Sequence, residues 1–187
     1  KAELISRLTS ARSTLCLNDS SVTKFERNNL INKTFGASIT STFKTFDFNI
    51  DENSTSLSVT AKHDAYKNNF NYLHQRTIRI NKKNGNLIGE DSLTTEYNVT
   101  KSANVYSIRF HLCPGINAVQ TIGKNSILIQ IERNKSLIFT ANKENIFLEK
   151  SIFLGRNQIV NNLCITISGT LTNNENKKIF WEFKKDN

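Results

Sequence analysis

The sequence predicts an all-β fold, a large antiparallel sandwich of two sheets. Short runs of β-branched and aromatic residues alternate with polar residues at a period of two. Asn, Gly, Lys and Asp separate these runs, and no long stretch with a helical period interrupts them. With about ten or more strands, a sandwich is favoured over a barrel.

Eight runs are predicted as strands, in chain order residues 55–61, 76–80, 106–112, 126–132, 137–141, 146–154, 163–171 and 179–183. In the run 126–132, the side chains of Ile127, Ile129 and Ile131 share one face by the period-2 rule.

The last run has the pattern of a half-buried antiparallel strand. Ile179, Trp181 and Phe183 share one face, and Glu182 and Lys184 point the other way. The apolar face is expected to lie between the sheets.

Two turn signals lie between the predicted strands. Asn84-Gly85 predicts a hairpin with a type I′ turn, because both central residues of that turn need positive φ. The single proline, Pro114, follows the run 106–112, where a lost backbone donor costs least.

Length and composition predict one folded domain over residues 1–187. Sandwiches of this length often stay undivided, and 37% hydrophobic residues are too many for a disordered chain. The net charge of +9 and pI near 9.6 suit a polyanionic partner, either nucleic acid or an acidic polysaccharide. A solvated basic surface is the alternative. No zinc-finger or RNP-type motif supports nucleic-acid binding.

The cysteines Cys16, Cys113 and Cys164 are odd in number and far apart, which excludes a full disulfide framework and a CxxC site. Each lies among apolar residues, so buried free thiols are predicted.

The sequence contains no run of about 18 apolar residues, so no membrane span is predicted. The chain opens with Lys1 and enters strand-like sequence almost directly, so we expect a fragment or processed product. Its compartment stays open. GxSxG, GxGxxG and GxxxxGK[ST] motifs are absent, so hydrolase and nucleotide-binding activities have no support.

The three histidines are the candidates for chemistry. His63 ends an apolar stripe, and His74 and Arg76 share parity with Ile78 and Ile80, a stripe expected to face the core. A polar pair buried there must be hydrogen-bonded.

His111 shares a face with Arg109, opposite Phe110, and Asp64, Glu90 and Asp91 supply carboxylates that could meet these groups. The alternative for each histidine is an imidazole satisfied by a carboxylate or carbonyl. His and Asp suit a divalent metal such as zinc, but without HxH or HExxH spacing no metal or other cofactor is predicted.

Several motifs carry a resemblance to a family. In order and spacing, HDAY (63–66), LHQRT (73–77), GED (89–91) and RFHLCPG (109–115) resemble the HDGY, HxR, GEDxL and RFHLHPG series of bacterial heparinase II/III-like proteins. Further matches are ARSTL (11–15), LEKSIFLG (148–155), QIV (158–160) and IFWEF (179–183). Together they span nearly the whole chain.

The resemblance implies a two-part enzyme, with an N-terminal α/α toroid absent here and a C-terminal sandwich supplied by this chain. Characterised members cleave acidic polysaccharides by β-elimination, removing the proton α to a uronate carboxylate. The family's Tyr acid/base and neutralising group come mainly from the toroid, and a His comes from the sandwich. The resemblance implies an acidic polysaccharide as the partner. It also implies a bacterial protein of the periplasm or the cytoplasm.

The sequence departs from the family at two positions. Arg12 stands where the AHSTL motif has His, and Ala65 stands where HDGY has Gly. With a pKa above about 12, arginine cannot act as a base at neutral pH, but it can bind a carboxylate in bidentate fashion. We therefore expect the isolated chain to be inactive. The alternative to a lyase domain is a non-catalytic carbohydrate-binding or structural module.

The collinear motifs and shared facing predict that His63, His74, Arg76 and Asp91 lie near one another. The candidate polar or substrate-facing residues are Arg12, His63, His74, Arg76, Asp91, Arg109 and His111.

Overall fold

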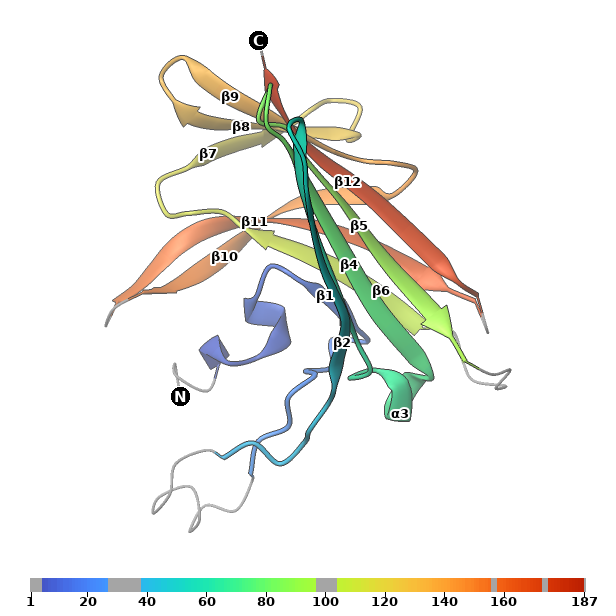
Figure 1. Ribbon diagram of the computed structural model, residues 1–187. Helices are drawn as coiled ribbons and strands as arrows, with labels where there is room; N and C mark the ends of the chain where they lie inside the picture. The colour runs from blue at the N-terminus through green and yellow to red at the C-terminus, as the bar shows by residue number, and fades with distance from the viewer. Residues whose placement is uncertain (1–4, 27–37, 97–103, 156–157, 173–174, 187) are drawn as a thin grey trace.

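Twelve antiparallel strands form a two-sheet sandwich in the computed structural model, which describes residues 5–26, 38–96, 104–155, 158–172 and 175–186 (Figure 1). The predicted fold class is confirmed. Because side chains alternate between faces along each strand, one face of each sheet is apolar and the two apolar faces pack together.

The smaller sheet has four strands in the order β1-β6-β11-β10. Ile108 and Phe110 of β6 and Ile165 and Ile167 of β11 are buried and fill its inner face. The bounds are β1 Leu15–Leu17, β6 Asn104–His111, β10 Asn145–Gly155 and β11 Gln158–Leu171.

The larger sheet has eight strands in the order β2-β3-β4-β5-β12-β9-β8-β7. The C-terminal strand β12 lies between β5 and β9, which joins the two halves of the sheet. The bounds are β2 Thr45–Glu52, β3 Ser56–His63, β4 Tyr72–Asn81, β5 Leu87–Thr95, β7 Asn117–Gln120, β8 Ser126–Glu132, β9 Lys135–Ala141 and β12 Lys177–Asp186.

Among the described residues, helical structure is limited to short pieces. The named helices are the 3-10 turn η1 (Thr9–Ala11) and the single-turn helix α3 (Lys67–Phe70), which ends where Asn71 takes a left-handed conformation with φ of 60°. In the described parts of the chain, no helix is long and apolar enough to cross a membrane.

Aromatic side chains join the sheets at the centre. Phe110 of the small sheet packs edge-on against Trp181 of β12, with ring centroids 4.7 Å apart. Phe139 and Phe183, from β9 and β12, are also separated by 4.7 Å. The predicted apolar face of the last strand is confirmed, because Ile179 and Trp181 are buried and Phe183 is partly buried.

All eight predicted runs coincide with strands, except that Thr55 and Leu112 lie one residue outside β3 and β6. Two details of their facing are wrong. Ile131 is 44% exposed because the register of β8 shifts between Gln130 and Glu132, which takes this residue off the inner face. Ile80 is also exposed, since the end of β4 extends away from the small sheet (Figure 1).

The β4–β5 hairpin is present, but its predicted two-residue type I′ turn is wrong. The connection spans residues 82–86, and within it Gly85 has positive φ, at 73°, whereas Asn84 does not. The Asn81 carboxamide oxygen accepts hydrogen bonds from the backbone of Lys83 and Asn84 at 2.9 and 3.3 Å. This side-chain acceptor stabilises a longer loop than the dipeptide predicts.

The predicted burial of the cysteines is right for two of them. Cys16 and Cys164 are buried and free, whereas Cys113 is exposed. The reason is that β6 ends at His111, and Cys113 begins a turn in which its carbonyl accepts a hydrogen bond from the Ile116 backbone.

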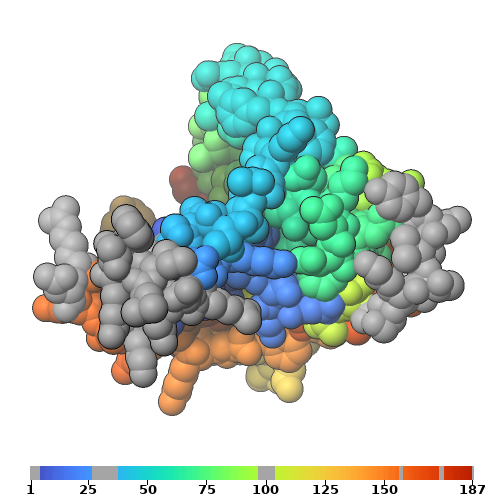
Figure 2. All heavy atoms as spheres, turned by 90° about the horizontal axis from the view of Figure 1, so that it is seen from below, coloured from blue at the N-terminus to red at the C-terminus, as the bar shows by residue number. Residues whose placement is uncertain are grey.

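The edge strand β2 contains a bulge. Its pairing with β3 shifts between Phe46 and Asn49, and Asp47 takes a left-handed φ of 51°. Around this bulge, Phe48 and Ile50 are exposed. The cyan atoms of the β2–β3 region stand out from the body of the molecule as a ridge in Figure 2.

Candidate functional site

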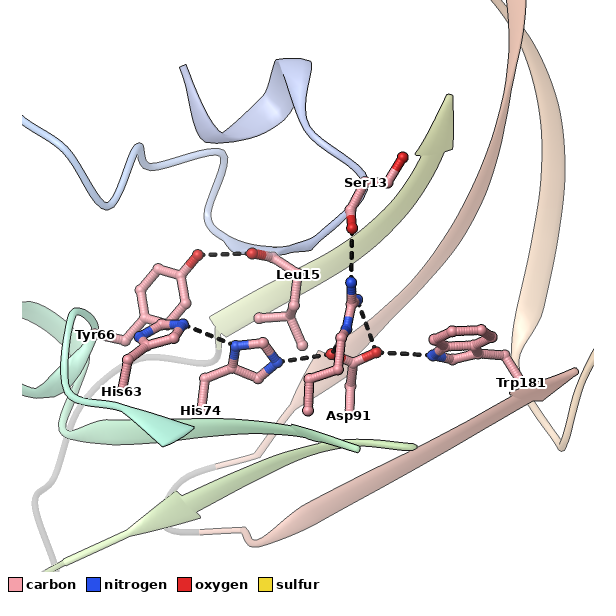
Figure 3. Close-up of polar contacts among 8 residues, drawn as sticks. Ser13, Leu15, His63, Tyr66, His74, Asp91 and Trp181 are labelled. Atoms are coloured by element: carbon pink, nitrogen blue, oxygen red, sulfur yellow. Dashed lines mark hydrogen bonds and ion pairs between the residues drawn. The ribbon is translucent and has the colours of Figure 1, made fainter. Parts of the chain in front are cut away.

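The register of three neighbouring strands brings four predicted residues together. His63 of β3 lies opposite His74 of β4, and Arg76 of β4 lies opposite Asp91 of β5. The four side chains form one hydrogen-bonded chain (Figure 3). The predicted proximity of these residues is confirmed.

Asp91 is the centre of this group, which we call the Asp91 network. Its carboxylate is fully buried and accepts hydrogen bonds from Arg76 Nε at 2.8 Å and Arg76 Nη2 at 2.9 Å. It also accepts from His74 Nε2 at 2.7 Å and from the indole Nε1 of Trp181 at 2.8 Å. Four donors to one carboxylate keep a buried charge satisfied.

These contacts determine the ionisation of Asp91. Burial alone would raise the pKa of the carboxyl group, but the hydrogen bond from His74 and the positive charge of Arg76 outweigh burial and lower the pKa to about 2. Asp91 is therefore an anion at neutral pH.

The hydrogen bonds also assign the tautomers of the two histidines. The backbone N–H of Ala65 donates to His63 Nδ1 at 3.3 Å, so the proton of neutral His63 sits on Nε2. His63 Nε2 then donates to His74 Nδ1 at 2.9 Å, and His74 Nε2 donates to Asp91. A directional chain of hydrogen bonds thus runs from Ala65 to Asp91.

Trp181 and Gly89 complete the network, and neither was a predicted site residue. Gly89 lies opposite Trp181, and a Cβ on Gly89 would stand 2.0 Å from the indole Cζ2. The missing side chain lets the indole lie flat on β5 and reach Asp91. A glycine inside a strand marks such a close approach, and Gly89 in the GED motif was therefore the available signal.

The network holds a segment of the chain that leads into β1. Arg76 Nη1 donates to the Ser13 carbonyl oxygen at 2.6 Å, and the backbone N–H of His111 donates to Ser13 Oγ at 3.1 Å. His111 Nε2 also donates to the Ser10 carbonyl oxygen at 3.0 Å. Residues 10–14, here called the clamped segment, are therefore fixed from both sheets. Ser13 was not predicted as a site residue.

Arg12 projects from the clamped segment into a hollow of about 290 Å³, which we call the Arg12 hollow. In the described parts of the chain its guanidinium has no hydrogen-bond or ion-pair partner. None of the described residues that line the hollow is acidic, and Arg12 gives this lining a net positive charge. The lining residues are Ser6, Ala11, Arg12, Ser13, His111, Ile152, Phe153, Leu154 and Asn162.

Arg109 occupies a different place. It lies on the outer face of the small sheet, in a hollow of about 300 Å³, and donates to Ser107 Oγ at 2.8 Å and to Asp19 Oδ1 at 2.9 Å. Glu149 also lines this Arg109 hollow. One guanidinium and two carboxylates give it a net negative charge.

Two of the suggested carboxylates do not join the network. Asp64 accepts a hydrogen bond from the Lys44 backbone at 2.7 Å, and Glu90 forms an ion pair with Lys178 at 3.0 Å on the outer face. Among the described residues, no group of three or more His, Cys, Asp or Glu side chains could hold a metal ion.

All of the described tyrosine side chains are buried. Tyr66 donates to the Leu15 carbonyl oxygen at 2.8 Å, and Tyr106 donates to Glu144. Burial is the main cause that raises the pKa of Tyr66, Tyr72 and Tyr106. None of the three is placed to exchange a proton with a bound substrate.

Parts of several solved structures share this fold. The heparan sulfate lyase HepC from Pedobacter heparinus superposes with a TM-score of 0.74 at 14% identity, over 97% of this chain and 25% of that one. A structure of heparinase III gives 0.70 at 14% identity over 100% and 26%. The 4-alpha-glucanotransferase from Thermococcus litoralis gives 0.50 at 7% identity over 94% and 28%.

The family described as heparinase II/III-like, C-terminal, matches residues 2–182. The chain therefore belongs to this family, as the motifs predicted. It spans about a quarter of the length of the two lyase structures. No curated protein matches the sequence.

Proposed function

We propose that this chain is the sandwich domain of a polysaccharide lyase that acts on uronate-containing acidic polysaccharide, and that it forms part of the substrate cleft. One observation carries the proposal: the Arg12 guanidinium, without a partner in the described residues, stands in a hollow whose described lining contains no acidic side chain. The clamped segment holds it there through Arg76 and His111.

Within that function the chain recognises the polymer and does not cleave it alone. Elimination needs a base for the α-proton, an acid for the leaving oxygen and a group that neutralises the uronate carboxylate. Arg12 can neutralise a carboxylate but cannot serve as the base. His63 and His74 are occupied in the Asp91 network, and the described tyrosines are buried.

The remaining groups would come from the α/α toroid that the family resemblance implies. Positioning several groups around one sugar contributes on the order of 7–11 kcal/mol to such reactions, so a sandwich without those groups is expected to be inert. An upstream helical region of toroid length with Tyr and His in the parent gene would support this assignment. A parent gene without it would favour the alternative, a non-catalytic carbohydrate-binding or structural module.

Binding of the purified chain to heparin, alginate and double-stranded DNA across a salt series tests recognition. We expect the two uronate polymers to bind more tightly than DNA at equal salt, and Arg12→Gln to weaken their binding selectively. Equal affinities and one common salt slope for all three polymers would indicate general charge attraction and contradict the proposal.

Incubation with the same uronate polymers, followed by ultraviolet absorbance of the unsaturated product, tests inertness. No turnover above the blank is expected. Turnover that disappears in Arg12→Ala would overturn this part of the proposal.

A further inference from the structure

The two hollows on the small sheet differ in charge, and this difference separates their ligands. The Arg109 hollow already pairs its guanidinium with Asp19 and contains Glu149, so an anion would meet two carboxylates there. The Arg12 hollow offers a guanidinium that has no partner among the described residues, and its described lining has no carboxylate. An anionic ligand is therefore favoured at the Arg12 hollow alone.

A second feature of the Arg12 hollow is an unsatisfied acceptor. Asn162 lines the hollow and is only 8% exposed. Its Nδ2 donates to the Leu112 carbonyl oxygen at 2.8 Å, which fixes the orientation of the carboxamide. Its Oδ1 is buried and has no hydrogen-bond partner. A buried acceptor without a donor is unfavourable, so a ligand hydroxyl, or a water held by the ligand, would stabilise it.

A third feature is an apolar wall. Phe153 of β10 lines the hollow and is 42% exposed, and its neighbour Ile152 is exposed beside it. An aromatic ring that stays open to solvent at the side of a polar hollow suits the C–H face of a pyranose ring.

We propose that the Arg12 hollow is a subsite for a single anionic pyranose unit. Arg12 binds its carboxylate or sulfate, Asn162 accepts from a ring hydroxyl, and Phe153 packs against its C–H face. This inference rests on the proposed function and goes beyond it, because it assigns the specificity for a sugar to Asn162 and Phe153. Charge alone would require Arg12 only.

The test measures oligosaccharide binding to the full chain by calorimetry. Three tetrasaccharides serve as probes: unsulfated heparosan with carboxylates only, a sulfated dextran fragment with sulfates only, and neutral maltotetraose. The variants are Phe153→Ala, Asn162→Ala and Arg12→Gln. Phe147→Ala is the matched control, because Phe147 is 46% exposed on the same strand but lines the Arg109 hollow.

We expect Phe153→Ala and Asn162→Ala each to weaken binding of the anionic tetrasaccharide about fivefold. Phe147→Ala should bind as the wild-type chain does, and maltotetraose should bind to none of them. The preferred probe among heparosan and sulfated dextran identifies the anion. If Asn162→Ala does not fold, Phe153→Ala decides.

Two results would overturn the subsite, and they are distinguishable. Loss of binding in Arg12→Gln with full binding in Phe153→Ala and Asn162→Ala would leave the proposed function standing and remove the subsite. A wild-type chain that binds neither the tetrasaccharides nor the uronate polymers would remove both.

Discussion

Arg76 and Asp91 face each other across β4 and β5 and form a bidentate ion pair, with nitrogen–oxygen distances of 2.8 and 2.9 Å, in which the Asp91 carboxylate is fully buried and Arg76 is partly buried. A third nitrogen of the same guanidinium bonds the Ser13 carbonyl. One side chain thus links the interior carboxylate to the segment that presents Arg12.

Asp91→Asn is expected to destabilise the chain by about 3–5 kcal/mol, because Arg76 would keep its charge in the interior without a counterion. Urea denaturation measures the loss. Glu90→Gln is the control, since Glu90 pairs with Lys178 on the outer face, and should cost less than about 1 kcal/mol. Equal losses in the two variants would contradict the central role of Asp91.

Stability should fall as the pH is lowered from 6.5 towards 4. Burial and the neighbouring His74 lower the pKa of His63 from its ordinary value of 6.5 to about 4. In that window the unfolded chain binds a proton that the folded chain excludes, so folding is favoured above pH 6.5 and loses about 3 kcal/mol by pH 4.

Chemical denaturation at a series of pH values measures this dependence. His63→Gln should be less stable at pH 7 but should show a flatter profile between pH 6.5 and 4. A variant as steep as the wild-type chain would assign the effect to other groups. Asp91, with its pKa of about 2, adds a loss only at lower pH.

Gly89→Ala should destabilise by about 1–3 kcal/mol or more, because the new Cβ would overlap the indole of Trp181. Thermal unfolding and the fluorescence of Trp181, the sole tryptophan, both report the displacement. Gly123→Ala is the matched control. Its Cβ would meet nothing closer than 3.4 Å, and a similar shift in both variants would argue against the close approach.

In the folded chain, a thiol reagent should modify Cys113 alone. Cys113 is exposed, whereas burial raises the pKa of the Cys16 and Cys164 thiols and denies them access. Mass spectrometry should find one modified thiol in native buffer and three in denaturant. Fast native labelling of Cys164 would show that the small sheet opens.

Local periodicity predicted the strands well, because half-buried strands leave a direct trace in the sequence. It did not predict their partners. The three residues of β1 pair with β6, about ninety positions later, and β12 inserts between β5 and β9. Such distant pairings depend on which apolar faces pack together, and no local pattern encodes them.

The residues of the candidate site likewise fall into those that the sequence predicted and those that it did not. His63, His74, Arg76 and Asp91 were predicted as a group because their motifs are collinear with a family and their side chains share a face. Ser13, Asn162 and Trp181 were not predicted as site residues. Their roles come from one backbone carbonyl, one fixed carboxamide and one close strand contact, all of which arise only after the sheets have packed.

The bulge at Asp47 has a consequence for how copies of this chain meet. β2 is an edge strand with exposed Phe48 and Ile50, and a flat apolar edge offers unpaired backbone groups to another molecule. The left-handed turn at Asp47 interrupts that row, and its carboxylate, 3.8 Å from Lys62, adds charge beside it. The bulge and the charge therefore disfavour the addition of a further strand at β2.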